Sequence, residues 1–242
     1  MSSFKKISVI IPCKNEEKGL RKVIEGIPLK DLAKLGYSLD VIVVDNNSTD
    51  KTREIALKMK VKVLFEERSG KGYAIRKAFD NLSKDTDYVV LIDGDNTYKT
   101  SEIPRLIEPL ASSFADVIVG SRLSGKTYKG SLSVEHRLAN WFYTFLIRHF
   151  YRVNTTDVLS GFIALKEKAV EDLRKVLVSN GFSIEMELNI KASRLGYEIY
   201  SVPVTYDVRE GESKLEGFKD VVGIFLVFFR YIFWRVNKVK QN

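Results

Sequence analysis

The first half of the chain alternates between short, nearly continuous apolar runs and longer segments of mixed polarity. The apolar runs are rich in valine and isoleucine and cover residues 7–12, 39–45, 61–65, 87–93 and 115–120. Such runs predict strands that are covered on both faces. Helices are predicted between most of them, at residues 16–27, 50–59 and 72–82. This alternation predicts an α/β fold with a mainly parallel, twisted sheet flanked by helices.

Polar side chains collect where the predicted strands end. Asn15 and Glu16 follow the first strand, Asp45 ends the second, and Asp93 ends the fourth. In open α/β sheets, ligands bind outside the carboxyl ends of the strands. We therefore expect these four residues to lie along one edge of the sheet and to share a site.

Asp93 and Asp95 flank a glycine in the stretch "DGDN". Two carboxylates this close repel each other and raise the pKa of one of them, unless a cation lies between them and the substrate. Mg²⁺ or Mn²⁺ is commonly held by one or two carboxylates together with substrate phosphates. The same letters also suit a solvated acidic turn, so the motif alone leaves both interpretations open.

Two glycine-containing segments have the chemistry of phosphate binding. "GKG" at residues 70–72 opens a predicted helix, where the helix N-terminus and Lys71 favour negative charge. "REGESKL" at residues 209–215 can fold over an anion as a lid. A flexible loop is the alternative for the first segment, and a solvated surface turn is the alternative for the second.

Two aromatic, basic segments differ from the rest of the chain. Residues 131–153 place aromatic and aliphatic side chains near helical spacing beside three arginines, and residues 218–240 are apolar almost all round before a basic end. The apolar core of the second segment, from Val221 to Trp234, is shorter than the roughly 20 apolar residues that a spanning helix needs. We expect interfacial helices on a membrane surface, with packing against the sheet or in a dimer as the alternative. The expected division is one domain at residues 1–217, which includes the 131–153 helix, and a C-terminal helix at 218–242.

Composition narrows the class of protein and of partner. A chain of 242 residues with 45% hydrophobic and 29% charged residues is typical of one globular domain and excludes a disordered or fibrous protein. The net charge of +8 favours an anionic partner. The acidic pair argues against nucleic acid, since carboxylates repel a phosphate backbone unless a metal intervenes. The single cysteine excludes an internal disulfide, and the apolar N-terminal stretch is too short for a signal peptide, so we expect the chain to face the cytosol.

Seven segments occur in the order found in a known family: "SVIIPCKNEEKGL", "VIVVDNNSTDKT", "RSGKGYAIRKAF", "VVLIDGDNTY", "VIVGSRL", "DVLSGF" and "REGESKL". Together they resemble the inverting glycosyltransferases of family 2, with most similarity to polyprenyl- and dolichyl-phosphate hexose synthases. The resemblance runs from residue 7 to the "REGESKL" segment at 209–215. It implies a single nucleotide-sugar-binding domain of the glycosyltransferase A type.

The resemblance also implies roles for individual residues. It places Pro12, Asn15, Glu16 and Asp45 around the nucleotide, Lys71 near the donor, and Asp93 and Asp95 at a divalent metal, Mg²⁺ or Mn²⁺. It places Arg122, Arg137, Arg209, Ser213 and Lys214 around the phosphates of donor or acceptor, with the first three counted among the catalytic residues. Thr97 stands where dolichyl-phosphate mannose synthases tend to carry glutamine, so no side-chain metal ligand is implied there.

The expected reaction is inverting transfer of a hexose from a UDP- or GDP-linked donor to a polyprenyl or dolichyl phosphate at the cytosolic face of a membrane. The metal and arginines would stabilise the leaving diphosphate. A lipid phosphate is already anionic and needs no strong base, which agrees with the lack of an obvious third catalytic aspartate. Glu185 and Glu187 are candidates for an acceptor-side carboxylate, and their spacing suggests that one of them is a surface residue.

Two other functions are consistent with the sequence. A glycosyltransferase acting on a sugar or another hydroxyl acceptor would use the same donor half of the chain. A non-catalytic basic protein that binds nucleotides or membranes would explain the charge of +8.

Overall fold

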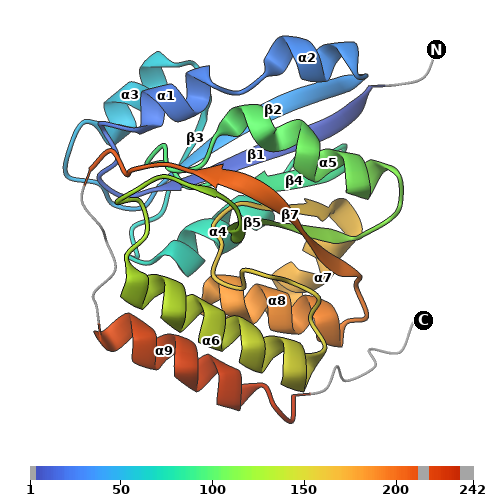
Figure 1. The fold of residues 1–242 in the computed structure, drawn as a ribbon. Helices are drawn as coiled ribbons and strands as arrows, with labels where there is room; N and C mark the ends of the chain where they lie inside the picture. Colours follow the sequence, from blue (N-terminus) through green and yellow to red (C-terminus); the bar gives the residue numbers. More distant parts are fainter. Residues whose placement is uncertain (1–3, 212–217, 235–242) are drawn as a thin grey trace.

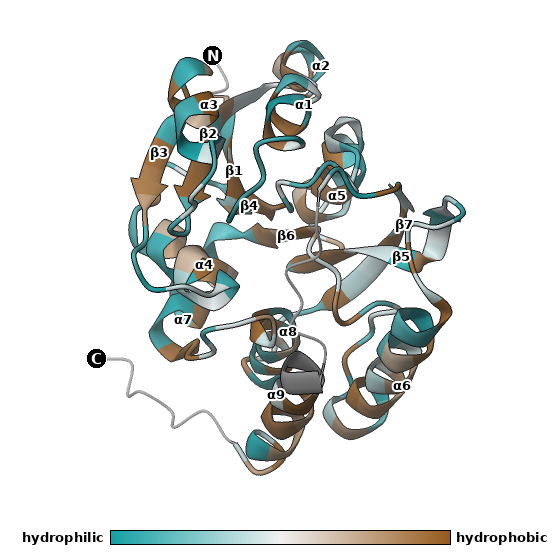
Figure 2. Ribbon diagram, turned by 90° about the vertical axis from the view of Figure 1, so that its left-hand side faces the viewer, coloured by the Kyte–Doolittle hydropathy of each residue, from teal (hydrophilic) through white to brown (hydrophobic). Residues whose placement is uncertain are grey.

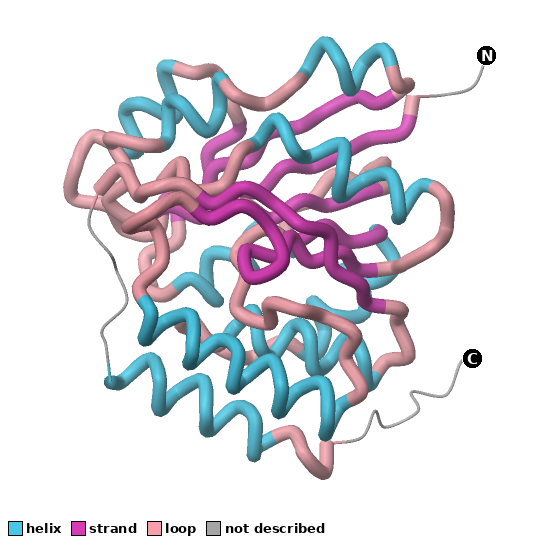
Figure 3. Tube along the Cα trace, in the orientation of Figure 1, coloured by secondary structure: helices cyan, strands magenta, loops and turns pink. Residues whose placement is uncertain are grey.

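A computed structural model describes residues 4–211 and 218–234, without the side chains of residues 218–221. Within these residues one seven-stranded sheet has the order β3-β2-β1-β4-β6-β5-β7 (Figure 1). The strands are β1 Lys5–Cys13, β2 Tyr37–Asp45, β3 Lys62–Phe65, β4 Tyr88–Leu91, β5 Val117–Thr127, β6 Ile163–Lys166 and β7 Ile199–Tyr206. In this sheet β6 runs antiparallel to both β4 and β5, and the other neighbouring pairs are parallel. Figure 3 shows the strands of the sheet with helices on both sides. The predicted mainly parallel sheet is confirmed.

Helices cover both faces of the sheet. Their bounds are α1 Leu20–Glu25, α2 Leu29–Lys34, α3 Thr52–Lys58, α4 Lys71–Asp80, α5 Ile103–Ala111, α6 Val134–Tyr151, α7 Glu167–Val176, α8 Ile184–Arg194 and α9 Phe218–Arg230, with a 3₁₀ turn at Thr100–Glu102. Helices α1, α2, α3 and α5 lie on one face, α4, α7 and α8 lie on the other, and α6 and α9 form an outer layer beyond α8 (Figure 1). Strand β1 shows why the core has two parts: Ile7, Val9 and Ile11 belong to the cluster on the first face, and Ile10 belongs to the cluster on the second.

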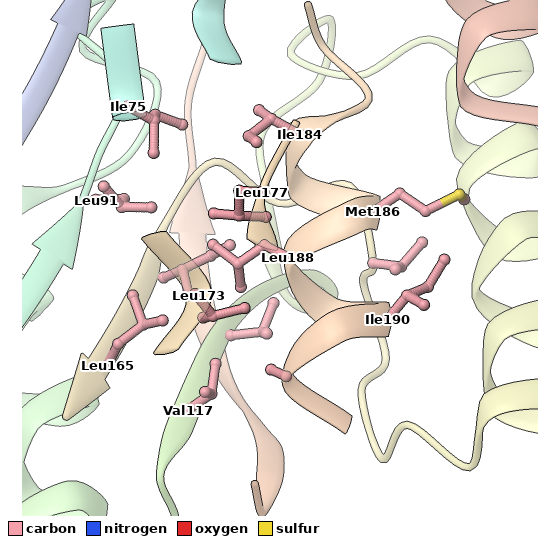
Figure 4. Close-up of a cluster of buried hydrophobic side chains, with 14 of the residues drawn as sticks. Ile75, Leu91, Val117, Leu165, Leu173, Leu177, Ile184, Met186, Leu188 and Ile190 are labelled. Carbon is pink, nitrogen blue, oxygen red and sulfur yellow. The ribbon is translucent and has the colours of Figure 1, made fainter. Parts of the chain in front are cut away.

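Helix α8 is buried between the sheet and the outer layer. Figure 4 shows Leu188 among Leu173, Leu177 and Leu165 on the sheet side, while Met186 and Ile190 point to the opposite side. All residues from 184 to 192 are buried. The expectation that Glu185 or Glu187 is a surface residue is therefore wrong, because a helix covered on both sides has no solvent face here.

Several element boundaries differ from the sequence expectations. The predicted helix at 16–27 is shortened to α1, because Asn15 has a φ of 54° and the Glu16 amide donates to Thr52 Oγ1 at 2.7 Å instead of opening a helix. Strand β5 continues to Thr127 rather than ending at residue 120, and strands β6 and β7 were not predicted. Helix α9 ends at Arg230, followed by a turn in which the Trp234 amide donates to the Tyr231 carbonyl, whereas the expected helix ran to residue 240.

The outer layer also carries many apolar side chains on its outer side. We call this surface the aromatic face. It consists of Val134, Leu138, Trp141, Phe142, Phe145 and Phe150 on α6, and Val222, Phe225, Leu226, Phe229 and Phe233 on and after α9, all of them exposed. Phe150 of α6 contacts Phe228 of α9 edge-on, with ring centroids 5.5 Å apart. Figure 2 shows hydrophobic residues along both helices. In the part of the chain that the structure describes, we find no helix with the length and hydropathy needed to cross a bilayer.

Candidate active site

A pocket of about 440 Å³ opens at the carboxyl ends of the parallel strands. This volume is within the range of small-ligand sites, and the position is the one expected for a ligand in an open α/β sheet. Six predicted site residues line it: Pro12, Glu16, Lys71, Asp93, Asp95 and Arg209. The structure therefore brings together residues that are up to about 200 positions apart in the sequence.

The backbone just after β4 presents the two aspartates to the pocket. A side chain at Gly94 would come within 2.6 Å of Cys13 Sγ, so only glycine fits between the carboxylates. Asp95 is buried, and its Oδ1 accepts from the Thr97 amide at 3.0 Å and from Thr97 Oγ1 at 2.6 Å. Thr97 therefore orients the carboxylate of Asp95.

Asp93 and Asp95 are each paired with a cation. Lys71 Nζ lies 2.5 Å from Asp93 Oδ1 and 2.5 Å from Glu185 Oε1, and Arg209 Nη2 lies 2.9 Å from Asp95 Oδ2. Burial alone would raise the pKa of Asp93, but Lys71, and after it Arg209, bring that pKa below its ordinary value. Burial of Glu185 raises its pKa, and Lys71 only partly offsets this effect. A diphosphate entering the pocket would meet two cations that are already in place.

The N-terminus of α4 holds Lys71 against very close backbone neighbours. A side chain at Gly72 would lie 2.1 Å from the Ser179 carbonyl oxygen, and one at Gly70 would lie 2.2 Å from that of Asn180. The Gly70 amide also donates to Asn46 Oδ1 at 2.7 Å. Sequence reasoning did not assign Asn46, although its place directly after Asp45 at the end of β2 could have indicated it.

The loop that contains "DVLSGF" packs against the carboxylate of Asp93 through Gly161. A side chain at Gly161 would come within 2.2 Å of Asp93 Oδ2. The Gly161 amide donates to the hydroxyl of the buried Tyr98 at 3.0 Å, which fixes the glycine at this position. Sequence reasoning quoted the motif but missed this role, because the contact joins residues that are distant in sequence.

The segment after β7 returns across the residues that follow Asp95. The Asp207 amide donates to the Thr97 carbonyl at 2.8 Å, the Glu210 amide donates to the Asp95 carbonyl at 3.1 Å, and Asn96 Nδ2 donates to Glu210 Oε1 at 2.8 Å. These main-chain bonds on either side of Arg209 hold its guanidinium opposite Asp95.

Asn15 and Asp45 lie beside the pocket, and neither is among the described residues that line it. The Thr49 amide donates to Asn15 Oδ1 at 2.8 Å. Asp45 is buried, accepts from the Ser48 amide at 3.1 Å, and pairs with Arg53 Nε at 2.8 Å. Both side chains shape the turn between β2 and α3, and their contact with a nucleotide stays a prediction.

Arg122 and Arg137 are not among the described residues that line the pocket. Arg122 Nε and Nη2 donate to the two carboxylate oxygens of the buried Asp157, both at 2.8 Å, and Nη2 also donates to the Leu159 carbonyl at 2.9 Å. Arg137 is exposed in the first turn of α6. Ser213 and Lys214 lie outside the described residues.

The donor set fits a divalent metal that shares its coordination with a substrate. Among the described residues there is no cluster of three or more His, Cys, Asp or Glu side chains able to hold a metal ion. Asp93 and Asp95 supply two carboxylates at the pocket, which is the usual protein share of a Mg²⁺ or Mn²⁺ site completed by phosphates.

Comparisons with known proteins agree with this geometry. The sequence profile of glycosyl transferase family 2 matches residues 8–174. The chain is 35% identical over 217 residues to a low-salt glycan biosynthesis hexosyltransferase of Haloferax volcanii, which covers 88% of this chain and 51% of that protein. It is 32% identical over 246 residues to the dolichol-phosphate mannosyltransferase of Pyrococcus furiosus, covering 95% of this chain and 64% of that protein. The chain thus spans about half the length of the first relative.

A solved structure shows the same fold. The chain is similar, with a TM-score of 0.70 and 26% identity, to glucosyl-3-phosphoglycerate synthase from Mycobacterium tuberculosis in a complex with Mn²⁺ and UDP-glucose. The match covers 93% of this chain and 79% of that one. The expected glycosyltransferase A-type fold is confirmed.

Proposed function

The chain belongs to glycosyl transferase family 2, and from that premise we propose that it transfers a hexose from a nucleotide sugar to a polyprenyl phosphate. The observation that carries the donor half of this proposal is the pocket in which Asp93 and Asp95 are each paired with a cation. The relatives include hexosyltransferases, and the solved structure holds UDP-glucose with Mn²⁺. A UDP- or GDP-linked hexose is therefore the proposed donor.

The residues divide the work of the reaction among themselves. Asp93 and Asp95 would hold Mg²⁺ or Mn²⁺, which would supply electrophilic stabilisation of the departing diphosphate. Lys71 and Arg209 bind the diphosphate oxygens and stabilise the charge that grows on them. Pro12 and Glu16 line the same pocket, and their proposed role is to contact the nucleotide. The acceptor oxygen attacks the anomeric carbon from the side opposite to the diphosphate, so the configuration inverts.

The exposed aromatic surface of α6 supports a lipid acceptor. The inner face of the helix is mixed: Tyr143 and Ile147 pack in the core, while Asn140 Nδ2 donates to Asp157 Oδ1 at 2.6 Å and Thr144 Oγ1 accepts from the Val158 amide at 3.1 Å. Its outer face is aromatic and lies next to the exposed Arg137 and Arg148. Contiguous exposed apolar surface rimmed by basic residues is typical of contact with an anionic membrane.

One end of this surface lies on the donor side. The first turns of α6 and α9 lie on the same side of the molecule as the loops that leave the carboxyl ends of β1 and β2 (Figure 1). A polyprenyl phosphate with its tail in a lipid leaflet could present its headgroup to Arg137 and then to the pocket. We propose that the protein binds the cytosolic leaflet as a peripheral or monotopic protein.

A hydroxyl acceptor is the second candidate, and one observation favours it. Glu185 lies beside the pocket on Lys71, and its raised pKa is suited to accepting a proton from a hydroxyl group. Glu185 was one of the two candidates that the sequence offered for an acceptor-side carboxylate, and it would fill the place of the third aspartate that the sequence lacks.

Transfer assays with both acceptor classes decide between these functions. A panel of UDP- and GDP-hexoses is incubated with Mn²⁺ and either polyprenyl phosphate in anionic vesicles or a soluble sugar acceptor. Each donor carries a label in its sugar. We expect the label of one donor to appear in a lipid-linked product. Product on the soluble sugar alone would establish the hydroxyl-acceptor function, and no turnover or binding of any donor would overturn the enzymatic proposal.

A further inference from the structure

Helix α8 carries a second buried carboxylate that does not line the pocket. The side chain of Glu187 is fully buried and accepts from the Val178 amide at 3.1 Å, the Ser179 amide at 2.6 Å, Lys191 Nζ at 2.6 Å and the Tyr231 hydroxyl at 2.6 Å. Burial would raise the pKa of Glu187, but the hydrogen bonds from Lys191 and Tyr231 lower it below its ordinary value. A buried carboxylate with this many donors fixes the groups around it, since each lost donor leaves uncompensated charge.

From Glu187 the contacts lead to the pocket through residues 178–180. The Asn180 carbonyl accepts from the Gly72 amide at 2.9 Å, and Asn180 Oδ1 accepts from Arg76 Nη2 at 2.7 Å. As described above, a side chain at Gly70 or Gly72 would clash with the carbonyl oxygens of Asn180 and Ser179, so the start of α4 packs directly against this segment. The next two residues, 181 and 182, line the pocket. The Val178 and Ser179 amides, which donate to Glu187, thus belong to the segment that packs against Lys71. We call residues 178–182 the pocket wall.

In the other direction the contacts lead to the end of α9. Tyr231 is buried in the turn that follows this helix. Lys191 Nζ lies 4.4 Å from the centroid of the Tyr231 ring and 5.3 Å from that of Trp234. Arg194 Nη2 donates to the Ile232 carbonyl at 3.0 Å. The end of α9 is therefore fastened to α8 at the point where Glu187 is held.

We propose that Glu187 is a positioning residue for the donor pocket and that the Tyr231 hydroxyl makes its placement depend on α9 being seated on α8. Movement of α9 away from α8 removes one donor from Glu187 and loosens residues 178–182 and the start of α4. The outer side of α9 is part of the aromatic face, so whatever that face contacts acts on the pocket wall. By linkage, a ligand that orders the pocket wall also favours the seated position of α9.

Hydrogen exchange tests this coupling without any assumption about the substrate. Tyr231→Phe removes one oxygen atom and should speed exchange of the Val178, Ser179 and Gly72 amides about tenfold or more in the folded protein. Glu187→Gln keeps the volume of the side chain and should act on the same amides. The matched control is Tyr197→Phe. The Tyr197 hydroxyl donates to Asp172 at 2.8 Å and to the Lys168 carbonyl at 3.1 Å, and it makes no hydrogen bond to residues 178–182 of the described chain. The pocket-wall amides of this variant should exchange at the wild-type rate.

Two results would overturn the proposal. The first is wild-type exchange at these three amides in both folded variants. The second is equal acceleration in the Tyr197→Phe control, which would show a general loss of stability. Trp234→Leu provides a further folded variant if Glu187→Gln does not fold, and it should produce a smaller effect at the same amides.

Kinetics separates positioning from a merely structural role. In Tyr231→Phe, the KM for the nucleotide sugar should rise about fivefold or more, while the KM for the acceptor stays unchanged. This second measurement rests on the proposed function, and the exchange measurement does not. Failure of donor turnover in the wild-type protein would therefore count against the proposed function alone.

Discussion

Asp93 and Asp95 reach the pocket already neutralised by Lys71 and Arg209. On the proposed function, the two carboxylates would hold Mg²⁺ or Mn²⁺, and Lys71 and Arg209 would then be available to the phosphates of the donor. Each charge would keep a partner of opposite sign, so the repulsion between two neighbouring carboxylates would stay compensated.

Asp95→Asn tests the metal role. The amide oxygen can still accept from Thr97, so the fold should persist, but the lost charge should lower kcat/KM about 100-fold or more. The assay is hexose transfer with Mn²⁺, with chelation of the wild-type protein as a parallel arm. Asp85→Asn changes an exposed carboxylate and should leave activity intact. Full activity in excess chelator would contradict the metal role.

Gly161→Ala tests the support behind Asp93. The added methyl group would lie 2.2 Å from Asp93 Oδ2, so the carboxylate or the loop must move. We expect transfer to fall more than tenfold while the thermal transition stays cooperative. Gly223→Ala adds the same group where no atom lies within 4 Å, and it should retain wild-type activity. Equal activity in the two variants would show that Asp93 tolerates displacement.

Glu66 gives the protein a pH dependence of stability on its acid side. The hydrogen bond from Arg68 brings the pKa of Glu66 to about 2 from an ordinary value of 4.5. The unfolded chain therefore binds a proton, between pH 4.5 and 2, that the folded chain does not. The stabilisation is fully present above pH 4.5 and is lost as the pH falls toward 2.

Urea unfolding at pH 3.5 and pH 6 measures this effect. The free energy of unfolding should differ between wild type and Glu66→Gln by on the order of 1 kcal/mol at pH 6, since Arg68 is 64% exposed and its charge is screened. The difference should shrink at pH 3.5. Glu67→Gln, at an exposed neighbouring position, serves as the control. A difference that does not change with pH would contradict the assignment.

Among the elements, the ones predicted well are those whose sequence pattern is local. Apolar runs located β1 to β4 to within a few residues, because strands buried on both faces need such runs. Strand β7 was missed, since Pro203 and alternating polar residues hide it, and β6 is a short "IALK". The site residues were also predictable only where their signal is local. The carboxylates and Lys71 could be predicted from strand ends and a helix start. The pairing of Arg122 with Asp157 could not be predicted, because it depends on a tertiary contact across 35 positions.

The aromatic face belongs to two helices acting together, and α6 offers the cleaner test. Deleting α9 would remove Ile224, Val227 and Phe228 from the core, so loss of vesicle binding after truncation would be ambiguous. The double change Trp141→Glu with Phe145→Glu alters exposed side chains only.

We expect this double variant to lose vesicle binding more than tenfold, because two apolar anchors become charged. Co-flotation with anionic vesicles measures the binding, and nucleotide-sugar affinity should not change. Leu57→Glu places a charge at an equally exposed apolar position on α3 and should float as the wild type does. Undiminished flotation of the double variant would mean that the aromatic face meets something other than lipid.

At the scale of the whole molecule, the pocket is built by segments that follow both edge strands of the sheet, β3 and β7. Lys71 comes from the helix after β3, the aspartates follow β4, Glu185 lies on α8, and Arg209 follows β7. After β4 the chain forms β5, then returns to form β6 between β4 and β5, and then forms β7 at the far edge of the sheet. Only after β7 does it come back to the pocket with Arg209.

The return of the segment after β7 to the residues that follow Asp95 sets an order of assembly. The Asn96 and Glu210 side chains that meet there are 114 positions apart, and closing so long a loop is slow compared with forming the local units of the first half of the chain. During refolding from urea, nucleotide affinity should therefore recover with the slowest phase, after most helical signal has returned. Stopped-flow circular dichroism run beside binding of a fluorescent nucleotide would show the two signals separating in time. On the ribosome, the same order means that the nascent chain exposes an acidic, incomplete pocket until residue 209 has left the exit tunnel.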